Sequence, residues 1–268
     1  MQNEFQKIVQ TEELFFKYAK GMRDVVGKEI HTYHEILFFI SGDAEFITEE
    51  GKQQLTPNTT VIIPKETFHQ FIVLSDNSDY VRCVFNFEEV SQLEELISTK
   101  LNKVLLVQNE KINNIFQVLM DIENANLNVL ETNVLLKSLF AQILVEIKTN
   151  NSILCKNASF FNSKVETALA FINKNIEKSL SVETIANALN ISCSHLSHIF
   201  KKDMHISIYK YILKKRLLLA NKKIRNSIPP EQAAIQSGFN DYSGFYIQFK
   251  KMFGLPPSKA REKINKLL

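Results

Sequence analysis

The sequence predicts an α+β fold, with a small β-barrel and packed helices followed by an all-α domain of seven helices that contains two helix-turn-helix motifs joined by a linker helix. Three observations support this prediction. Short apolar runs separated by turn residues fill residues 30–87, apolar residues then recur at helical spacing, and residues 181–254 contain an imperfect repeat. We expect one domain over residues 1–150, a linker over 151–162 and a second domain over 163–268.

Length and charge agree with two domains of different function. The chain has 268 residues and is 45% hydrophobic, enough for two cores. Residues 1–160 contain 14 Lys and Arg against 22 Asp and Glu, whereas residues 161–268 contain 18 against 7. A basic half joined to an acidic half indicates a nucleic-acid-binding domain, although a basic solvated face without a partner would give the same counts.

Several classes of protein are disfavoured. Cys83, Cys155 and Cys193 are far apart, which predicts neither a disulfide framework nor a zinc site. Residues 1–16 are polar and acidic, unlike a secretory signal, and no apolar run approaches the roughly 18–20 residues that span a bilayer. We expect a soluble, cytoplasmic protein without a membrane partner.

The first domain begins with short strands, expected to form the barrel over about residues 25–88. Strands about 8–12 residues apart with turn residues between them are typical of a small barrel or sandwich. The apolar runs are Ile36–Ile40, Ala44–Thr48, Val61–Ile63, Phe71–Leu74 and Val81–Phe87.

Helices are expected next, over residues 89–103, 109–123 and 132–148. The last of these has a wide apolar stripe. One side of the stripe can pack on the barrel, and the surplus either forms a homodimer face or is buried in the same domain. Its members are Leu135, Leu136, Leu139, Phe140, Ile143, Leu144 and Ile147. An Asn- and Ser-rich stretch then marks the linker.

The repeat in the basic half has the pattern helix, tight turn, helix. Ala186 matches Ala234, where two helices approach closely, and Ile191 matches Phe239, which fills the turn. Ser192, and either Asn240 or Asp241, are suitable N-caps for the second helix of each copy.

A helix-turn-helix presents its second helix to the major groove of double-stranded DNA. Ser and His can hydrogen-bond base edges, Ile and Tyr can contact thymine methyls, and Lys can contact phosphates. The predicted DNA-binding residues are Ser192, Cys193, Ser194, Ser197, His198, Lys201 and Lys202 in the first copy, and Asn240, Tyr242, Ser243, Tyr246, Ile247, Lys250 and Lys251 in the second. Further phosphate contacts are expected from Lys214, Lys215, Lys222 and Lys223.

A continuous helix is expected between the copies, over residues 207–224. Eighteen helical residues extend about 27 Å at about 1.5 Å per residue. Because one turn of B-DNA is about 34 Å, two reading helices held by such a rod can enter successive major-groove segments.

A metal cluster is the alternative for the first copy, because Cys193, His195, His198 and His205 are close in sequence. No second cysteine or acidic ligand is nearby, so we interpret His195 as a packing residue and His198 as facing DNA. The sequence predicts no metal and no cofactor.

The strings RLLLA (216–220), GFNDYSGFYIQFKKMFG (238–254) and PPSKAR (256–261) resemble the signature of the AraC/XylS family of transcription regulators. The resemblance covers about residues 163–265. It departs from the family pattern at His205 (usually Gly), Ala233 (often Ile), Gly244 (usually larger) and Ala260 (usually Tyr). The resemblance implies a DNA-binding regulator of a promoter or operator, an activator that also contacts RNA polymerase.

The first domain is similar, more loosely, to the cupin-like sensor domain of that family, with landmarks at His34-Glu35, Gly42, Pro64 and His69. The resemblance implies a small-molecule effector, such as a sugar or another metabolite, bound inside the barrel. Candidate lining residues are His34, Phe38, Phe46, His69, Phe71 and Arg82, each of which could equally fill the core.

A metal-dependent cupin enzyme with a DNA-binding tail is the first alternative. His31 and His34 are three residues apart, so on one strand they face opposite sides and only one can join His69. With Glu35 or Glu45 this makes a poor metal site, and we do not expect an enzyme. A regulator controlled by a partner protein is the second alternative.

Overall fold

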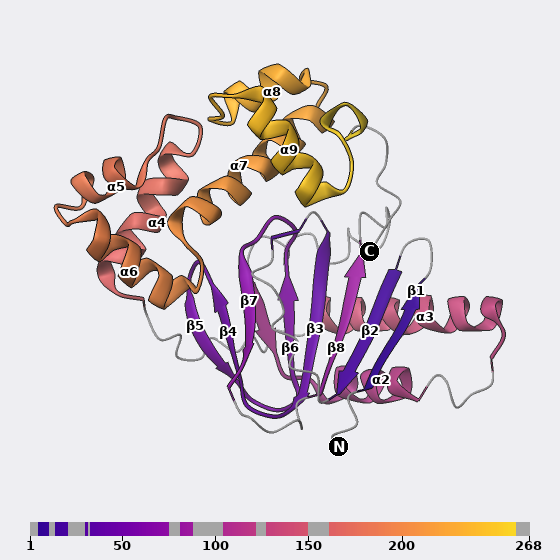
Figure 1. The fold of residues 1–268 in the computed structure, drawn as a ribbon. Helices are drawn as coiled ribbons and strands as arrows, with labels where there is room; N and C mark the ends of the chain where they lie inside the picture. Colours follow the sequence, from indigo (N-terminus) through magenta and orange to yellow (C-terminus); the bar gives the residue numbers. More distant parts are fainter. Residues whose placement is uncertain are drawn as a thin grey trace. The chain divides into compact units, whose positions relative to one another are not determined.

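The computed structural model describes residues 5–10, 14–20, 30–31, 33–74, 81–87, 104–121, 127–149 and 161–260 (Figure 1). They divide into two compact units, with the division between residues 159 and 160. We call these the N-terminal unit and the C-terminal unit.

The N-terminal unit contains two antiparallel sheets. The larger has the order β1-β2-β8-β3-β6-β9 and the smaller the order β5-β4-β7. The strands of the larger sheet are β1 (Phe5–Gln10), β2 (Leu14–Lys20), β3 (His34–Ser41), β6 (Thr59–Ile63), β8 (Val81–Phe87) and β9 (Leu105–Val107). Those of the smaller sheet are β4 (Ala44–Thr48), β5 (Gly51–Leu55) and β7 (His69–Val73).

The sheets differ from the predicted barrel in two respects. The described strands form two separate sheets and do not close into one barrel. The sequence could not show this, because strand spacing alone does not determine which strands pair. Strands β1 and β2 also precede residue 25, where the barrel was expected to begin, and β9 lies in a segment expected to connect helices. A three-residue apolar run such as β9 is too short to be recognised by periodicity.

Side chains of β3 alternate between two cores. Ile36 and Phe38 pack with the helices α2 (Glu110–Met120) and α3 (Val129–Thr149), and the Phe38 ring stacks on Phe116 at 4.5 Å. Leu37 and Phe39 belong instead to a cluster between the sheets. This period of two explains why β3 is almost entirely buried.

The apolar stripe of the expected helix 132–148 lies on α3 and packs on the larger sheet (Figure 1), as one of the two alternatives predicted. Five of its seven members are at most 1% exposed, Leu139 is 7% exposed, and Leu135 is partly buried. Other aliphatic residues of α3 remain exposed, namely Val129, Leu130, Val134 and Val145. The expected helix 89–103 lies outside the described residues.

The C-terminal unit contains six α-helices and one 3-10 helix among its described residues. They are α4 (Ser163–Asn175), α5 (Val182–Ala188), α6 (Cys193–Met204), α7 (Ile208–Arg225), α8 (Pro230–Gln236), α9 (Tyr242–Phe253) and η3 (Pro257–Lys259). The seventh predicted helix lies mostly in residues 261–268, outside the described part. Helix α7 packs against both α6 and the pair α8–α9 (Figure 1).

The predicted linker extends two residues too far. Phe161 is 5% exposed, and the Asn162 side chain caps α4 by accepting from the Lys164 N–H at 2.9 Å. The Asn162 N–H also donates to Asp203 at 2.8 Å, so both residues are part of the helical unit. Residues 151–160 lie outside the described residues.

Candidate nucleic-acid interface

The two sequence copies form matching helix-turn-helix motifs, which confirms the repeat, and the connection of the second (residues 237–241) is one residue longer than that of the first (residues 189–192). We call α5–α6 the first motif and α8–α9 the second motif. The Ile191 N–H donates to the Ala186 carbonyl at 3.1 Å, and the Phe239 N–H donates to the Ala234 carbonyl at the same distance. Both alanines are buried. A larger residue at either position would separate the helices that this turn joins.

The turns and caps also correspond. Asn190 and Gly238 occupy the left-handed region, with φ of 54° and 88°, and these are the residue types that tolerate it best. The Ser192 hydroxyl caps α6 by accepting from the His195 N–H at 3.2 Å, as predicted. Asp241, one of the two candidates, caps α9 by accepting from the N–H groups of Ser243 and Gly244.

The second helix of each motif has one buried and one exposed face. Leu196 and Phe200 anchor α6, and Phe245 and Phe249 anchor α9, all at 0% exposure. All the predicted DNA-binding residues are exposed. At or just before α6 these are Ser192, Cys193, Ser194, Ser197, His198, Lys201 and Lys202, and at or just before α9 they are Asn240, Tyr242, Ser243, Tyr246, Ile247, Lys250 and Lys251. The exposed faces therefore carry the residues expected to contact DNA.

Tyr242 and Ile247 place aromatic and aliphatic surface on the exposed face of α9, at 38% and 62% exposure. Burial, together with the nearby Glu231 and Tyr246, raises the pKa of Tyr242. The Tyr242 hydroxyl therefore keeps its proton at neutral pH and can donate a hydrogen bond.

Two predictions for this unit are wrong. His195 is exposed, because Leu196 and Ile199 occupy the buried positions of α6, so His195 lies on the solvent face beside His198. Lys223 does not face outward for phosphate, since its Nζ donates to Glu177 at 2.9 Å and to the Gln236 carbonyl at 3.1 Å. Glu177 is 46 residues away in sequence, which no local pattern reveals.

The remaining predicted phosphate contacts differ in exposure. Lys201 and Lys202 end α6, Lys250 and Lys251 lie in the last turn of α9, and all four are exposed. Lys222 is exposed, whereas Lys214 and Lys215 are partly buried.

Arg216 of α7 links the segment after α4 to the turn of the second motif, a role that the sequence did not indicate. Its Nε donates to the Ile176 carbonyl at 3.0 Å and its Nη2 to the Lys178 carbonyl at 2.6 Å, both just beyond α4. Burial lowers the pKa of Arg216. A Cβ at Gly238, in the turn of the second motif, would lie 2.7 Å from the Arg216 Nε. The α4 end, α7 and this turn therefore meet at one guanidinium group.

The structure separates the residues predicted to line an effector pocket. Phe46 and Phe71 lie in the cluster between the sheets, and His69 stacks near Phe46 at 5.9 Å. Phe38 faces α2 instead, and His34 occupies a β3 position of the same parity, with its Nδ1 accepting from the Lys65 N–H at 3.1 Å. Arg82 pairs with Phe39 in the sheet, but its side chain lies outside the described part.

One group of potential metal ligands lies within the described residues, formed by His31, Glu35 and His69. The cysteine and histidines of α6 form no such group among these residues. The sequence left open whether His31 or His34 joins His69, and the structure places His31 beside His69.

Two family profiles match the chain. One, described as an AraC-like ligand binding domain, matches residues 13–143, and a helix-turn-helix domain profile matches residues 185–263. The chain belongs to the AraC family of transcription regulators. It combines that family's ligand-binding domain with a helical DNA-binding domain, as the resemblance implied.

Relatives of this AraC-family protein match along most of its length. It is 26% identical over 248 residues to the Msm operon regulatory protein of Streptococcus mutans, covering 89% of this chain and 87% of the relative. It is 25% identical over 247 residues to the transcriptional activator RhaR of Mannheimia succiniciproducens, covering 89% and 80%. A ToxT structure from Vibrio cholerae aligns over 97% of this chain and 99% of ToxT, at 16% identity and a TM-score of 0.40.

No helix within the described part of this AraC-family protein is long and apolar enough to cross a membrane.

Proposed function

We propose that this regulator activates transcription by binding promoter DNA through both helix-turn-helix motifs, in response to a small-molecule effector bound by the N-terminal unit. The observation that carries the proposal is the solvent-exposed, largely polar face of α6 and its counterpart on α9. The major groove is wide enough to admit one α-helix, and the exposed face of that helix contacts the base edges. RNA polymerase is the second macromolecular partner, since one relative that matches over 89% of this chain is named an activator.

The two motifs contribute unequally to the proposed DNA contact. The α6 face has Ser194, Ser197 and His198, which can exchange hydrogen bonds with base edges. The α9 face has Tyr246 and Ile247, whose surfaces suit thymine methyls, and Gly244, which has no side chain. We infer that α6 supplies more of the direct base contacts and that α9 anchors the protein through apolar contact and phosphates.

Helix α7 sets the spacing of the two DNA-binding helices in this proposal. Its 18 residues from Ile208 to Arg225 correspond to about 27 Å. Packing against α6 at one end and against α8 and α9 at the other makes it a rigid spacer. One chain can then contact two successive major-groove segments on one face of the DNA.

The effector is proposed to bind between the two sheets. Phe46, Phe71 and His69 remain candidates there, because Phe46 and Phe71 of the smaller sheet belong to the cluster between the sheets and His69 stacks near Phe46. Apolar side chains with a few polar groups typically line small-metabolite sites. An effector that binds one conformation better than another would shift the population that binds DNA.

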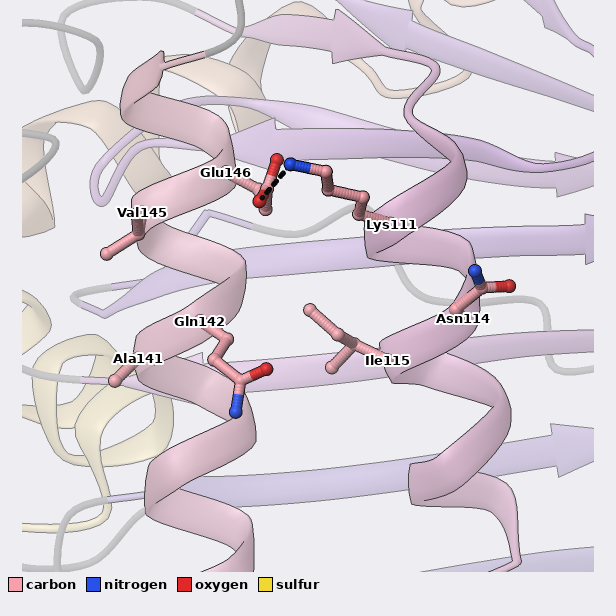
Figure 2. Close-up of a pocket in the computed structure, with 7 residues that line it drawn as sticks. All are labelled: Lys111, Asn114, Ile115, Ala141, Gln142, Val145 and Glu146. Carbon is pink, nitrogen blue, oxygen red and sulfur yellow. Dashed lines mark hydrogen bonds and ion pairs between the residues drawn. The ribbon is translucent and has the colours of Figure 1, made fainter.

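A homodimer is proposed through the exposed side of α2 and α3. Val129, Leu130 and Val134 are 79%, 71% and 61% exposed in the first part of α3, an unusual cluster for a surface helix. A groove of about 510 Å³ lies between α2 and α3 further along (Figure 2). Lys111 and Glu146 bridge its upper end at 3.2 Å, and Ile115 and Val145 line it.

The test is DNA binding by fluorescence anisotropy, with the DNA upstream of the gene and a scrambled duplex of equal composition. We expect preference for the upstream DNA, a steep loss of affinity between about 50 and 200 mM salt, and a change in affinity with one member of a metabolite panel. Equal binding to both duplexes at every salt concentration would contradict sequence-specific regulation. If the DNA affinity changes with a partner protein and with no metabolite, the regulator is controlled by that protein, and the effector part of the proposal is wrong.

A further inference from the structure

Three buried side chains with metal-ligating atoms meet where the two sheets of the N-terminal unit approach each other. His31 precedes β3, Glu35 lies in β3 of the larger sheet, and His69 begins β7 of the smaller sheet. Their exposed fractions are 9%, 4% and 1%. One ligand atom from each lies within 4.8 Å of the other two, and His31 Nε2 is 3.4 Å from Glu35 Oε2.

This spacing suits a shared ion. Bonds of about 2.0–2.2 Å from nitrogen or oxygen to a transition metal place neighbouring ligand atoms about 3.0–3.5 Å apart. The His31–Glu35 pair already has this separation. The other ligand atoms lie within 4.8 Å of one another, so the two imidazoles would move closer by up to about 1–2 Å when an ion binds.

The backbone hydrogen bonds of the two imidazoles are those that support metal-binding histidines. His31 Nδ1 lies 2.7 Å from the Tyr33 carbonyl, and His69 Nδ1 lies 3.1 Å from the Thr67 carbonyl. A carbonyl oxygen only accepts, so each Nδ1 donates, and the neutral form of each ring then has its lone pair on Nε2. A backbone carbonyl that accepts from the other ring nitrogen is the usual support of a metal-binding histidine.

Electrostatics favour a cation at the same point. The Glu35 side chain is almost fully buried, and a carboxylate in such a place needs compensating positive charge or hydrogen bonds. The His31 Nε2 is buried without a hydrogen bond and lies beside that carboxylate. A divalent ion would use this lone pair and neutralise the carboxylate together.

We propose that His31, Glu35 and His69 bind one divalent first-row transition-metal ion. Imidazole suits Zn²⁺, Fe²⁺, Ni²⁺ and Cu²⁺, and the carboxylate adds affinity for the harder ions, whereas Mg²⁺ and Ca²⁺ prefer oxygen ligands alone. Three protein ligands leave at least one coordination position for water or an oxygen atom of a bound small molecule. The ion would also join the two sheets, because its ligands come from both.

The test uses the full chain, stripped with a chelator and returned to Zn²⁺ or Fe²⁺ without oxygen, with metal content measured after gel filtration. A background of C193S, H195A and H198A removes the exposed ligands of α6. We expect about one ion per chain. Glu35→Gln and His69→Gln should each weaken binding at least about 100-fold, since removing even a residue that only hydrogen-bonds a metal ligand costs about 10–100-fold. His34→Gln, a buried histidine of the same strand, is the matched control and should leave binding unchanged.

A measurement on the unmutated chain keeps the test independent of folding defects. In long-range ¹H–¹⁵N spectra of the imidazoles, Zn²⁺ should shift the Nε2 resonances of His31 and His69 and leave those of His34 in place. Fewer than about 0.1 ion per chain with every metal tried, or equal binding by His69→Gln and the control, would overturn the proposal. Neither result depends on DNA binding, so the proposed function is tested separately.

Discussion

The guanidinium group of Arg216 donates to the Lys178 carbonyl at 2.6 Å and thereby ties the long α7 to the segment that follows α4. A second bond, from Nε to the Ile176 carbonyl at 3.0 Å, completes a fork that only arginine can form. The backbone at Gly238 of the second motif lies against the same guanidinium group, so closely that a Cβ there would be 2.7 Å from the Arg216 Nε. The position of the second motif relative to the end of α4 therefore depends on a residue outside the exposed face of either DNA-binding helix.

Arg216→Lys should lower the free energy of unfolding of the C-terminal unit by about 1–3 kcal/mol, because one ammonium group cannot make both bonds. DNA affinity should fall as well, with no change in which sequence is preferred. Thermal unfolding and anisotropy measure the two effects. Lys222→Ala, an exposed change on the same helix, is the control for stability. A lysine variant as stable as the unmutated protein would show that the fork contributes little.

Gly238→Ala should be more harmful than Gly254→Ala. Both glycines have positive φ, 88° and 72°, so each substitution costs about 1 kcal/mol of backbone strain. A Cβ at Gly238 would also meet Arg216 at 2.7 Å, whereas nothing lies within 4 Å at Gly254. Denaturant unfolding of both variants, alone and with Arg216→Ala, separates the two terms. The loss of unfolding free energy should be larger for Gly238→Ala than for Gly254→Ala, and this difference should shrink when Arg216 is replaced by Ala. A difference that stays the same would mean that backbone strain alone is responsible.

Much of the C-terminal unit could be predicted from sequence because its determinants are local. Ser192, Asp241 and the Ala186–Ile191 turn act within five residues of their partners, so their spacing is visible in the chain. Partners distant in sequence could not be predicted. Lys223 was assigned to DNA, although Glu177 lies across the fold, and the fork of Arg216 spans 38 and 40 residues.

The N-terminal unit shows the same limit in its sheets. The run Ile36–Ile40 predicted a strand, but it is apolar on both faces, and only the pairing of strands decides that Phe38 lies toward α2 and Phe39 between the sheets. His31 escapes the alternation rule because β3 begins at His34. The sequence therefore could not show which histidine joins His69.

His205→Gly should stabilise the protein. His205 ends α6 in the left-handed region with φ of 49°, at the position where Gly254 ends α9. Glycine relieves a backbone strain of about 1–2 kcal/mol, but it also raises the conformational entropy of the unfolded chain, which offsets part of this. The free energy of unfolding should therefore rise by up to about 1 kcal/mol. Thermal unfolding measures this gain. A lower midpoint would indicate that contacts of the His205 side chain outweigh the strain.

His198→Ala and Lys201→Ala should affect DNA binding in different ways. Both residues are exposed on α6, but the imidazole can hydrogen-bond a base edge and the ammonium group can contact phosphate. Loss of His198 should reduce the preference for the upstream DNA over scrambled DNA by about 1–3 kcal/mol, with a similar salt dependence. Loss of Lys201 should weaken binding to both duplexes and lower the salt slope by about 1.

Lys223→Ala is the matched control for these variants, because Lys223 is bonded within the fold to Glu177 and Gln236. It should reduce stability and leave the salt slope unchanged. Anisotropy titrations over a range of salt concentrations, at a temperature where every variant is folded, provide all three slopes. If Lys223→Ala lowers the slope as much as Lys201→Ala does, the DNA-facing surface includes α7, and the assignment of contacts to α6 and α9 is too narrow.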